Sequence, residues 1–137
     1  MGRLGLRYLL LGIVSLALFA STAQADNARV ARAQAIAVEH WGNVCDGKVK
    51  VTRGTLPRGM AGLASYRFNV KSPDRYYDCA MTFSRGRISW RKFCSVMVHE
   101  YGHLAGQGHS PDPADIMFPR YVKPFGGCSG SNPVKPF

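Results

Sequence analysis

Three of the four histidines in this 137-residue chain lie close together, in the run H-E-Y-G-H-L-A-G-Q-G-H from His99 to His109. Residues four apart on a helix are separated by about 40° around its axis, so His99 and His103 point the same way. Gly106 can adopt a positive φ, which ends the helix and turns the chain back until His109 reaches the same point. Three neutral imidazoles leave one position open on a tetrahedral zinc ion, which is typical of a catalytic site. Glu100 is rotated about 100° from His99, so it flanks the metal position without ligating it.

The same segment predicts a helix over about Arg91 to Ala105 whose opposite face is apolar. Its apolar side chains lie about 120–260° around the axis from His99. They are Phe93, Cys94, Met97, Val98, Tyr101, Leu104 and Ala105. One face of the helix is therefore expected to pack into the domain, while the other carries the ligands into a cleft.

The full pattern H-E-x-x-H-x-x-G-x-x-H resembles the zinc-binding motif of the metzincin proteases. Ser110, directly after the third histidine, and the run from Ile116 to Pro119 (I-M-F-P) resemble the matrixin branch and its Met-turn. The likeness is specific from His99 to Pro119 and looser from about Ala28 onward.

This resemblance implies a role for each matching residue. His99, His103 and His109 would bind Zn²⁺, Glu100 would be the general base, and Met117 would form a hydrophobic floor beneath the ion without ligating it.

The expected fold class is α+β: a metzincin-like domain with a small twisted mixed sheet, an N-terminal helix, the active-site helix and an irregular tail after the Met-turn. Periodicity and turn residues predict a helix over 28–41 and strands over 48–53 and 63–70. They also predict a turn over 72–74 and a hairpin of strands 79–84 and 87–90. By the resemblance, strand 79–84 would be the exposed edge that pairs with extended substrate.

Residues 1–25 have the pattern of a secretory signal peptide. Arg3 and Arg7 precede a mostly apolar run, Tyr8–Ala20, and the segment ends in Ala-Gln-Ala. A membrane anchor is the alternative, but the thirteen residues of that run cover only about 20 Å of a roughly 30 Å hydrocarbon core. Cleavage after Ala25 would release a single matrixin-like domain, residues 26–137, from the cell.

Export into an oxidising compartment predicts that the four cysteines form two disulfides. We expect Cys45–Cys79, joining the first helix to the sheet, and Cys94–Cys128, anchoring the tail behind the histidine helix; this is one of three connectivities. A cysteine-ligated zinc site is the alternative, but no two of these residues have C-x-x-C spacing.

These features predict a secreted zinc endopeptidase that hydrolyses peptide bonds through a zinc-bound water, with Glu100 taking its proton. The alternative is a non-catalytic, disulfide-stapled binding domain that retains zinc. We expect protein or peptide substrates, a monomer and no nucleic-acid partner, because no recognition motif accompanies the basic residues. Once residues 1–25 are removed, 16 Lys and Arg residues remain against 8 Asp and Glu residues. The resulting charge of +8 could give weak attraction to anionic surfaces, but the scattered basic residues favour dispersed surface charge.

Overall fold

The structure, a computed structural model, describes residues 26–130, apart from the side chains of residues 73–75. The predicted signal peptide, the cleavage site after Ala25 and the last seven residues lie outside this part. Within residues 26–130 the fold is α+β, with two helices and a mixed three-stranded sheet. In the described part, no helix has both the length and the apolar character needed to cross a bilayer.

The N-terminal helix covers residues 26–41 and ends at Gly42, whose φ of 79° is the left-handed conformation that closes many helices. A single 3-10 turn, η1 (Cys45–Gly47), leads into strand β1 (Val49–Gly54). Strand β2 (Gly62–Asn69) and strand β3 (Ser72–Ser84) follow. Helix α2 (Trp90–Leu104) and a second 3-10 turn, η2 (Gly126–Cys128), complete the order. The predicted first helix, first two strands and histidine helix are confirmed to within a few residues.

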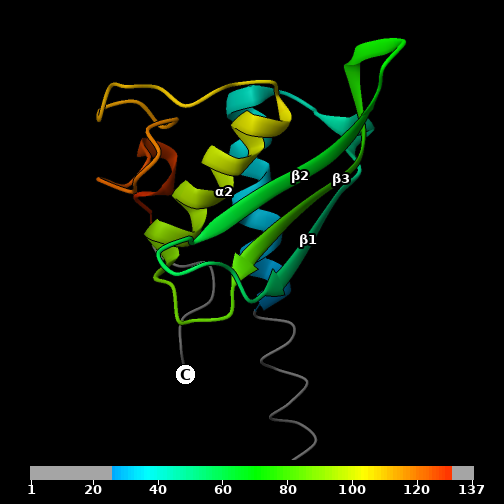
Figure 1. Cartoon of the computed structure of the whole chain (residues 1–137). Coiled ribbons are helices and arrows are strands. Elements are labelled where there is room, and N and C mark those ends of the chain that lie inside the picture. Colours follow the sequence, from blue (N-terminus) through cyan, green and yellow to red (C-terminus); the bar gives the residue numbers. More distant parts are fainter. Residues whose placement is uncertain (1–25, 131–137) are drawn as a thin grey trace, which may run out of the picture.

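The strand order is β1-β3-β2, with β1 parallel and β2 antiparallel to β3. Strand 79–84 is therefore central, and its prediction as the exposed edge is wrong. The edge strand beside α2 is β2. Figure 1 shows α2 between the sheet on one side and the C-terminal tail, coloured orange to red, on the other.

The predicted hairpin between strands 79–84 and 87–90 is also wrong. Ser89 caps α2, because its hydroxyl accepts a hydrogen bond from the Lys92 N–H at 3.4 Å, and Trp90 is already helical. Residues 79–84 pair instead with β1 and β2. The predicted turn over 72–74 lies two residues too late: the chain reverses at residues 70–71, where Asn69 Oδ1 accepts the Lys71 N–H at 2.9 Å.

The core lies between the two helices and one face of the sheet. Its fully buried side chains come from the N-terminal helix, β3 and α2: Ala33, Ala37, Met81, Phe83, Phe93, Met97, Val98 and Leu104. The far half of β2 leaves this core. Phe68 is 52% exposed and Val70 87%, so the tip of the β2–β3 hairpin projects beyond the domain body, as Figure 1 shows.

The structure forms two disulfides with the pairing that the sequence predicts. Cys45–Cys79 joins η1 to β3 with a Cα–Cα distance of 6.2 Å. Cys94–Cys128 joins α2 to the tail with a Cα–Cα distance of 5.7 Å. An additional residue in β3 at Asp78, with φ of 56°, forms a bulge immediately before Cys79, whose side chain is buried.

Candidate metal centre and its cleft

Helix α2 and the turn after it bring three histidines together. His99 and His103 share one face of α2, one helical turn apart. The helix ends after Leu104, and Gly106 has the expected positive φ of 85°. The Gln107 N–H then donates to the Gly102 carbonyl at 2.9 Å, which reverses the chain. As a result, nitrogen atoms of His99, His103 and His109 lie within 4.8 Å of one another.

Backbone carbonyls orient two of these imidazoles. His99 Nδ1 lies 2.8 Å from the Ile116 oxygen, and His103 Nδ1 lies 2.8 Å from the Gln107 oxygen. Since a carbonyl oxygen only accepts, each Nδ1 carries a proton, and in the neutral form of the ring the lone pair is then on Nε2. A hydrogen bond from one ring nitrogen to a backbone carbonyl is typical of histidines whose other ring nitrogen binds a metal.

The loop after His109 is held by two hydrogen bonds around Met117 and packs against α2. The Ser110 N–H donates to the Met117 carbonyl at 3.0 Å, and the Met117 N–H donates to Asp115 Oδ1 at 2.8 Å. Met117 is only 3% exposed and packs directly against Gly102 of α2. The structure therefore places the methionine of the predicted Met-turn next to the histidine helix.

Gly102 is a residue that the sequence interpretation missed. A Cβ there would lie 3.0 Å from Trp41 Cζ2 and 3.1 Å from Met117 Cε, and closer still to Met117 Sδ. The lack of a side chain thus lets both the N-terminal helix and the Met-turn approach α2. A glycine inside an otherwise regular helix, where it costs about 0.5–1 kcal/mol relative to alanine, is the signal that could have identified it.

Glu100 lies between α2 and the edge strand β2. It is only 7% exposed, and its Oε2 accepts the Ala64 N–H at 2.8 Å. Gly62 makes this approach possible, since a Cβ there would lie 2.6 Å from Val96 Cγ1 and 3.0 Å from the Glu100 side chain. Burial raises the pKa of Glu100, and the effect outweighs the opposing influence of His103 and of the Ala64 hydrogen bond.

Burial also lowers the pKa of His99, although its hydrogen bond to Ile116 acts in the opposite direction. The pKa of His109 is lowered, first by desolvation and then by the neighbouring His103 and His99. Both shifts favour the neutral imidazole, which is the form that binds a metal.

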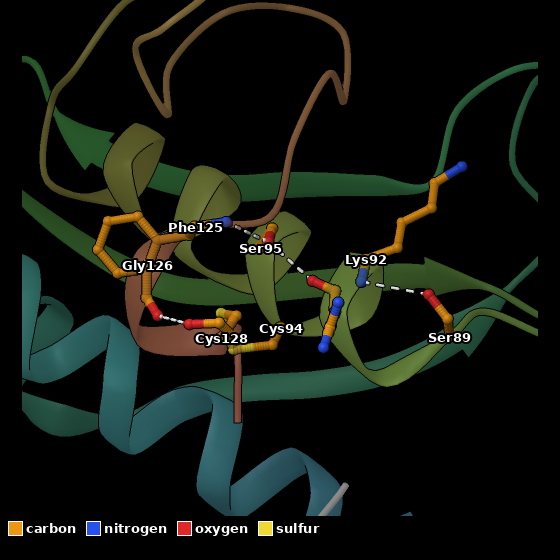
Figure 2. Close-up of a disulfide and its surroundings, with 9 residues drawn as sticks. Ser89, Lys92, Cys94, Ser95, Phe125, Gly126 and Cys128 are labelled. Carbon is orange, nitrogen blue, oxygen red and sulfur yellow. Dashed lines mark hydrogen bonds between the residues drawn. A yellow bond between two sulfur atoms is a disulfide. The ribbon is translucent and has the colours of Figure 1, made fainter. Parts of the chain in front are cut away.

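A cleft of about 810 Å³ opens over the histidines. Residues 59–64 form one wall, α2 forms the floor, and residues 113–126 of the tail form the other wall. Figure 2 shows how the tail is attached to α2: the Cys94–Cys128 disulfide lies beside the hydrogen bond from the Phe125 N–H to Ser95 Oγ, which is 2.9 Å long.

The donor set fits a zinc ion. Three imidazoles converge on one point, and no fourth histidine, cysteine or carboxylate joins them within residues 26–130. Closed structural zinc sites use four protein ligands, whereas three ligands and an open position are typical of catalytic sites.

This fold and this centre define a small α+β domain with a three-histidine site on a helix under a sheet edge. In agreement, the family profile described as matrixin matches residues 39–126. The chain therefore belongs to the matrixin family.

Relatives in the family share part of this sequence. Matrix metalloproteinase-20 of Homo sapiens is 33% identical over 72 residues, which are 51% of this chain and 15% of that protein. Neutrophil collagenase of Homo sapiens is 35% identical over 49 residues, which are 36% of this chain and 10% of that protein. The chain thus spans only a small part of the length of these relatives. No solved structure matches the chain significantly.

Proposed function

We propose that this chain is a secreted zinc-dependent endopeptidase in which His99, His103 and His109 hold the ion and Glu100 is the general base. The observation that best supports this proposal is the combination of three converging imidazoles with a buried carboxylate next to them at the base of an open cleft. A site that only stored or tolerated zinc would need the histidines alone.

Zinc bound there would supply Lewis acidity, which activates water and polarises a scissile carbonyl. Glu100 would take the proton of the attacking water and pass it to the leaving amine. The raised pKa supports this shuttle, because a carboxyl group that accepts a proton more readily is a better base near neutral pH. Its hydrogen bond to Ala64 holds the carboxylate in place between these transfers.

The edge strand supports a protein or peptide substrate. Within the described residues, β2 pairs only with β3, so its other edge faces the cleft where Gly62, Leu63 and Ala64 contribute to the wall. An extended peptide could add to this edge through backbone hydrogen bonds. Export by the segment 1–25 is part of the proposal and is supported by the two disulfides, which persist in oxidising compartments.

The decisive experiment compares wild type, Glu100→Ala and His103→Ala by zinc content and by hydrolysis of casein. We expect one zinc per chain in wild type and in Glu100→Ala, and loss of zinc in His103→Ala. Hydrolysis should fall by about 10²–10⁴-fold in Glu100→Ala, as expected when a general base is removed.

Glu39→Ala, which removes an exposed carboxylate from the N-terminal helix, is the matched control and should keep full activity. Wild-type protein that holds zinc but hydrolyses no peptide would instead support the non-catalytic binding domain.

A further inference from the structure

Cationic side chains outnumber carboxylates in the lining of the cleft. Three cationic side chains line it, from Lys92, Arg120 and Lys123, whereas its only carboxylates belong to Glu100 and Asp115. Glu100 lies at the histidines and is held by the Ala64 N–H. The negative charge is thus confined to the end of the cleft that holds the metal centre.

Asp115 belongs to the same end. Its Oδ1 accepts the Met117 N–H at 2.8 Å, and its charge acts on His99. Among the described residues, neither of the ion pairs Arg53–Asp26 and Arg67–Asp78 includes Lys92, Arg120 or Lys123.

Lys92 lies in the cleft at a distance from the histidines. It lies in the first turn of α2, seven residues before His99, so the two share one helix face and are separated by about 10 Å of helix rise. Figure 2 shows its side chain extending away from the Cys94–Cys128 disulfide. The ammonium group lies 5.7 Å from the centre of the Tyr121 ring, so the side chain bridges from the helix to the tail wall.

We infer that this end of the cleft is a subsite for an acidic side chain, glutamate or aspartate, of a peptide substrate. The inference rests on the proposed function and names the substrate class of the same site. A substrate backbone at the histidines would lie about 10 Å from the backbone of Lys92. An extended glutamate side chain and the Lys92 side chain can span this distance together. Lys92 is a half-buried residue with no carboxylate partner, and its ammonium group gains a charge-assisted hydrogen bond when such a carboxylate enters.

The other two cations strengthen the preference. Arg120 and Lys123 are exposed residues of the tail wall, and their positive charge adds to that of Lys92 in the same cleft. A lysine or arginine side chain of a substrate would meet repulsion here. A neutral apolar side chain could pack on the wall, but it would leave the cations in water and gain nothing from them.

The test uses zinc-loaded enzyme and fluorogenic peptides that carry Glu, Gln or Lys in turn at each of three positions on either side of the scissile bond. We expect one position at which Glu exceeds Gln by about five- to tenfold in kcat/KM, which corresponds to a partly exposed ion pair, with Lys the poorest. The ratio should shrink as salt is raised from about 0.05 to 0.5 M.

Lys92→Met should lower the Glu-to-Gln ratio, and Lys92→Met/Arg120→Met/Lys123→Met should abolish it. Lys50→Glu is the matched control, because Lys50 is exposed on β1 and absent from the cleft, so its reversal changes net charge alone and should leave the ratio unchanged. Equal rates for Glu and Gln at every position, or a ratio that survives in the triple variant, would overturn the subsite.

Binding separates this inference from the proposed activity. The dissociation constants of the same peptides for Glu100→Gln, measured by fluorescence anisotropy, should show the same preference for Glu. Selective binding without hydrolysis by wild type would refute the peptidase and keep the subsite. Hydrolysis without charge preference would refute the subsite and keep the peptidase.

Discussion

Gly102→Ala tests whether close packing of the Met-turn against α2 maintains the metal centre. The added methyl group would lie 3.0 Å from Trp41 Cζ2 and 3.1 Å from Met117 Cε, with Met117 Sδ nearer still, so both side chains must move. Trp41 is held in place by a 2.8 Å hydrogen bond from Nε1 to the Val98 carbonyl. Overpacking typically costs about 1–3 kcal/mol, and a shift of Trp41 would also weaken a hydrogen bond of the kind that contributes about 0.5–1.5 kcal/mol.

Alanine also favours the helix by about 0.5–1 kcal/mol relative to glycine, which offsets part of this cost. We therefore expect Gly102→Ala to lower the free energy of unfolding by about 1–3 kcal/mol, or the Tm by roughly 5–15 °C. Movement of Met117 also displaces the neighbouring Ile116 carbonyl that orients His99, so zinc affinity should fall about tenfold or more.

Thermal unfolding and zinc titration of four proteins measure both effects: wild type, Gly102→Ala, Met117→Ala and the double variant. The two substitutions should couple by about 1 kcal/mol or more, because removing the methionine makes room for the methyl group. Gly126→Ala is the control, since a Cβ there meets nothing within 4 Å. A Gly102→Ala protein as stable as wild type, or additive effects in the double variant, would refute this account of the packing.

Two further predictions concern the disulfide and pH. Cys94→Ala/Cys128→Ala should lower the free energy of unfolding by about 3–4 kcal/mol, because the bond closes a loop of 34 residues, and limited proteolysis should then cut the tail first; intact tail resistance would contradict this. In metal-free Glu100→Gln, which lacks the buried carboxyl and its opposite pH dependence, the free energy of unfolding should fall as pH drops below 6.5. The reason is that desolvation lowers the pKa values of His99 and His109 in the fold, so the unfolded chain takes up protons first. Chemical denaturation between pH 8 and 5.5 measures the slope, and a flat profile would contradict both shifts.

The histidine helix could be predicted because its information is local. Spacing placed His99 and His103 on one face, Gly106 ended the helix, and the apolar residues on the other side defined what is buried. The resemblance of the Met-turn to a known motif added Met117, which the structure places against α2.

The strand pairing could not be predicted in the same way. The segment 84–87, which contains Gly86, fits the turn of a hairpin between residues 79–84 and 87–90, because glycine favours turns. The chain reverses instead at residues 70–71, where the Asn69 side chain accepts the Lys71 N–H. Residues 88–90 suit either a strand or a helix start, and the Ser89 cap decides between them. The central position of strand 79–84 depends on its parallel pairing with β1, a long-range contact that local patterns do not encode.

The centre itself is held by partners that are distant from α2 in sequence. The edge strand supplies the Ala64 N–H for Glu100, the Met-turn supplies the Ile116 carbonyl for His99, and the tail is tied to the helix through Ser95. These contacts involve backbone groups, so they depend on where the segments run more than on which side chains they carry. The histidines on α2 therefore keep their orientation only while the edge strand, the loop that carries Ile116 and the disulfide-anchored tail continue to reach the helix.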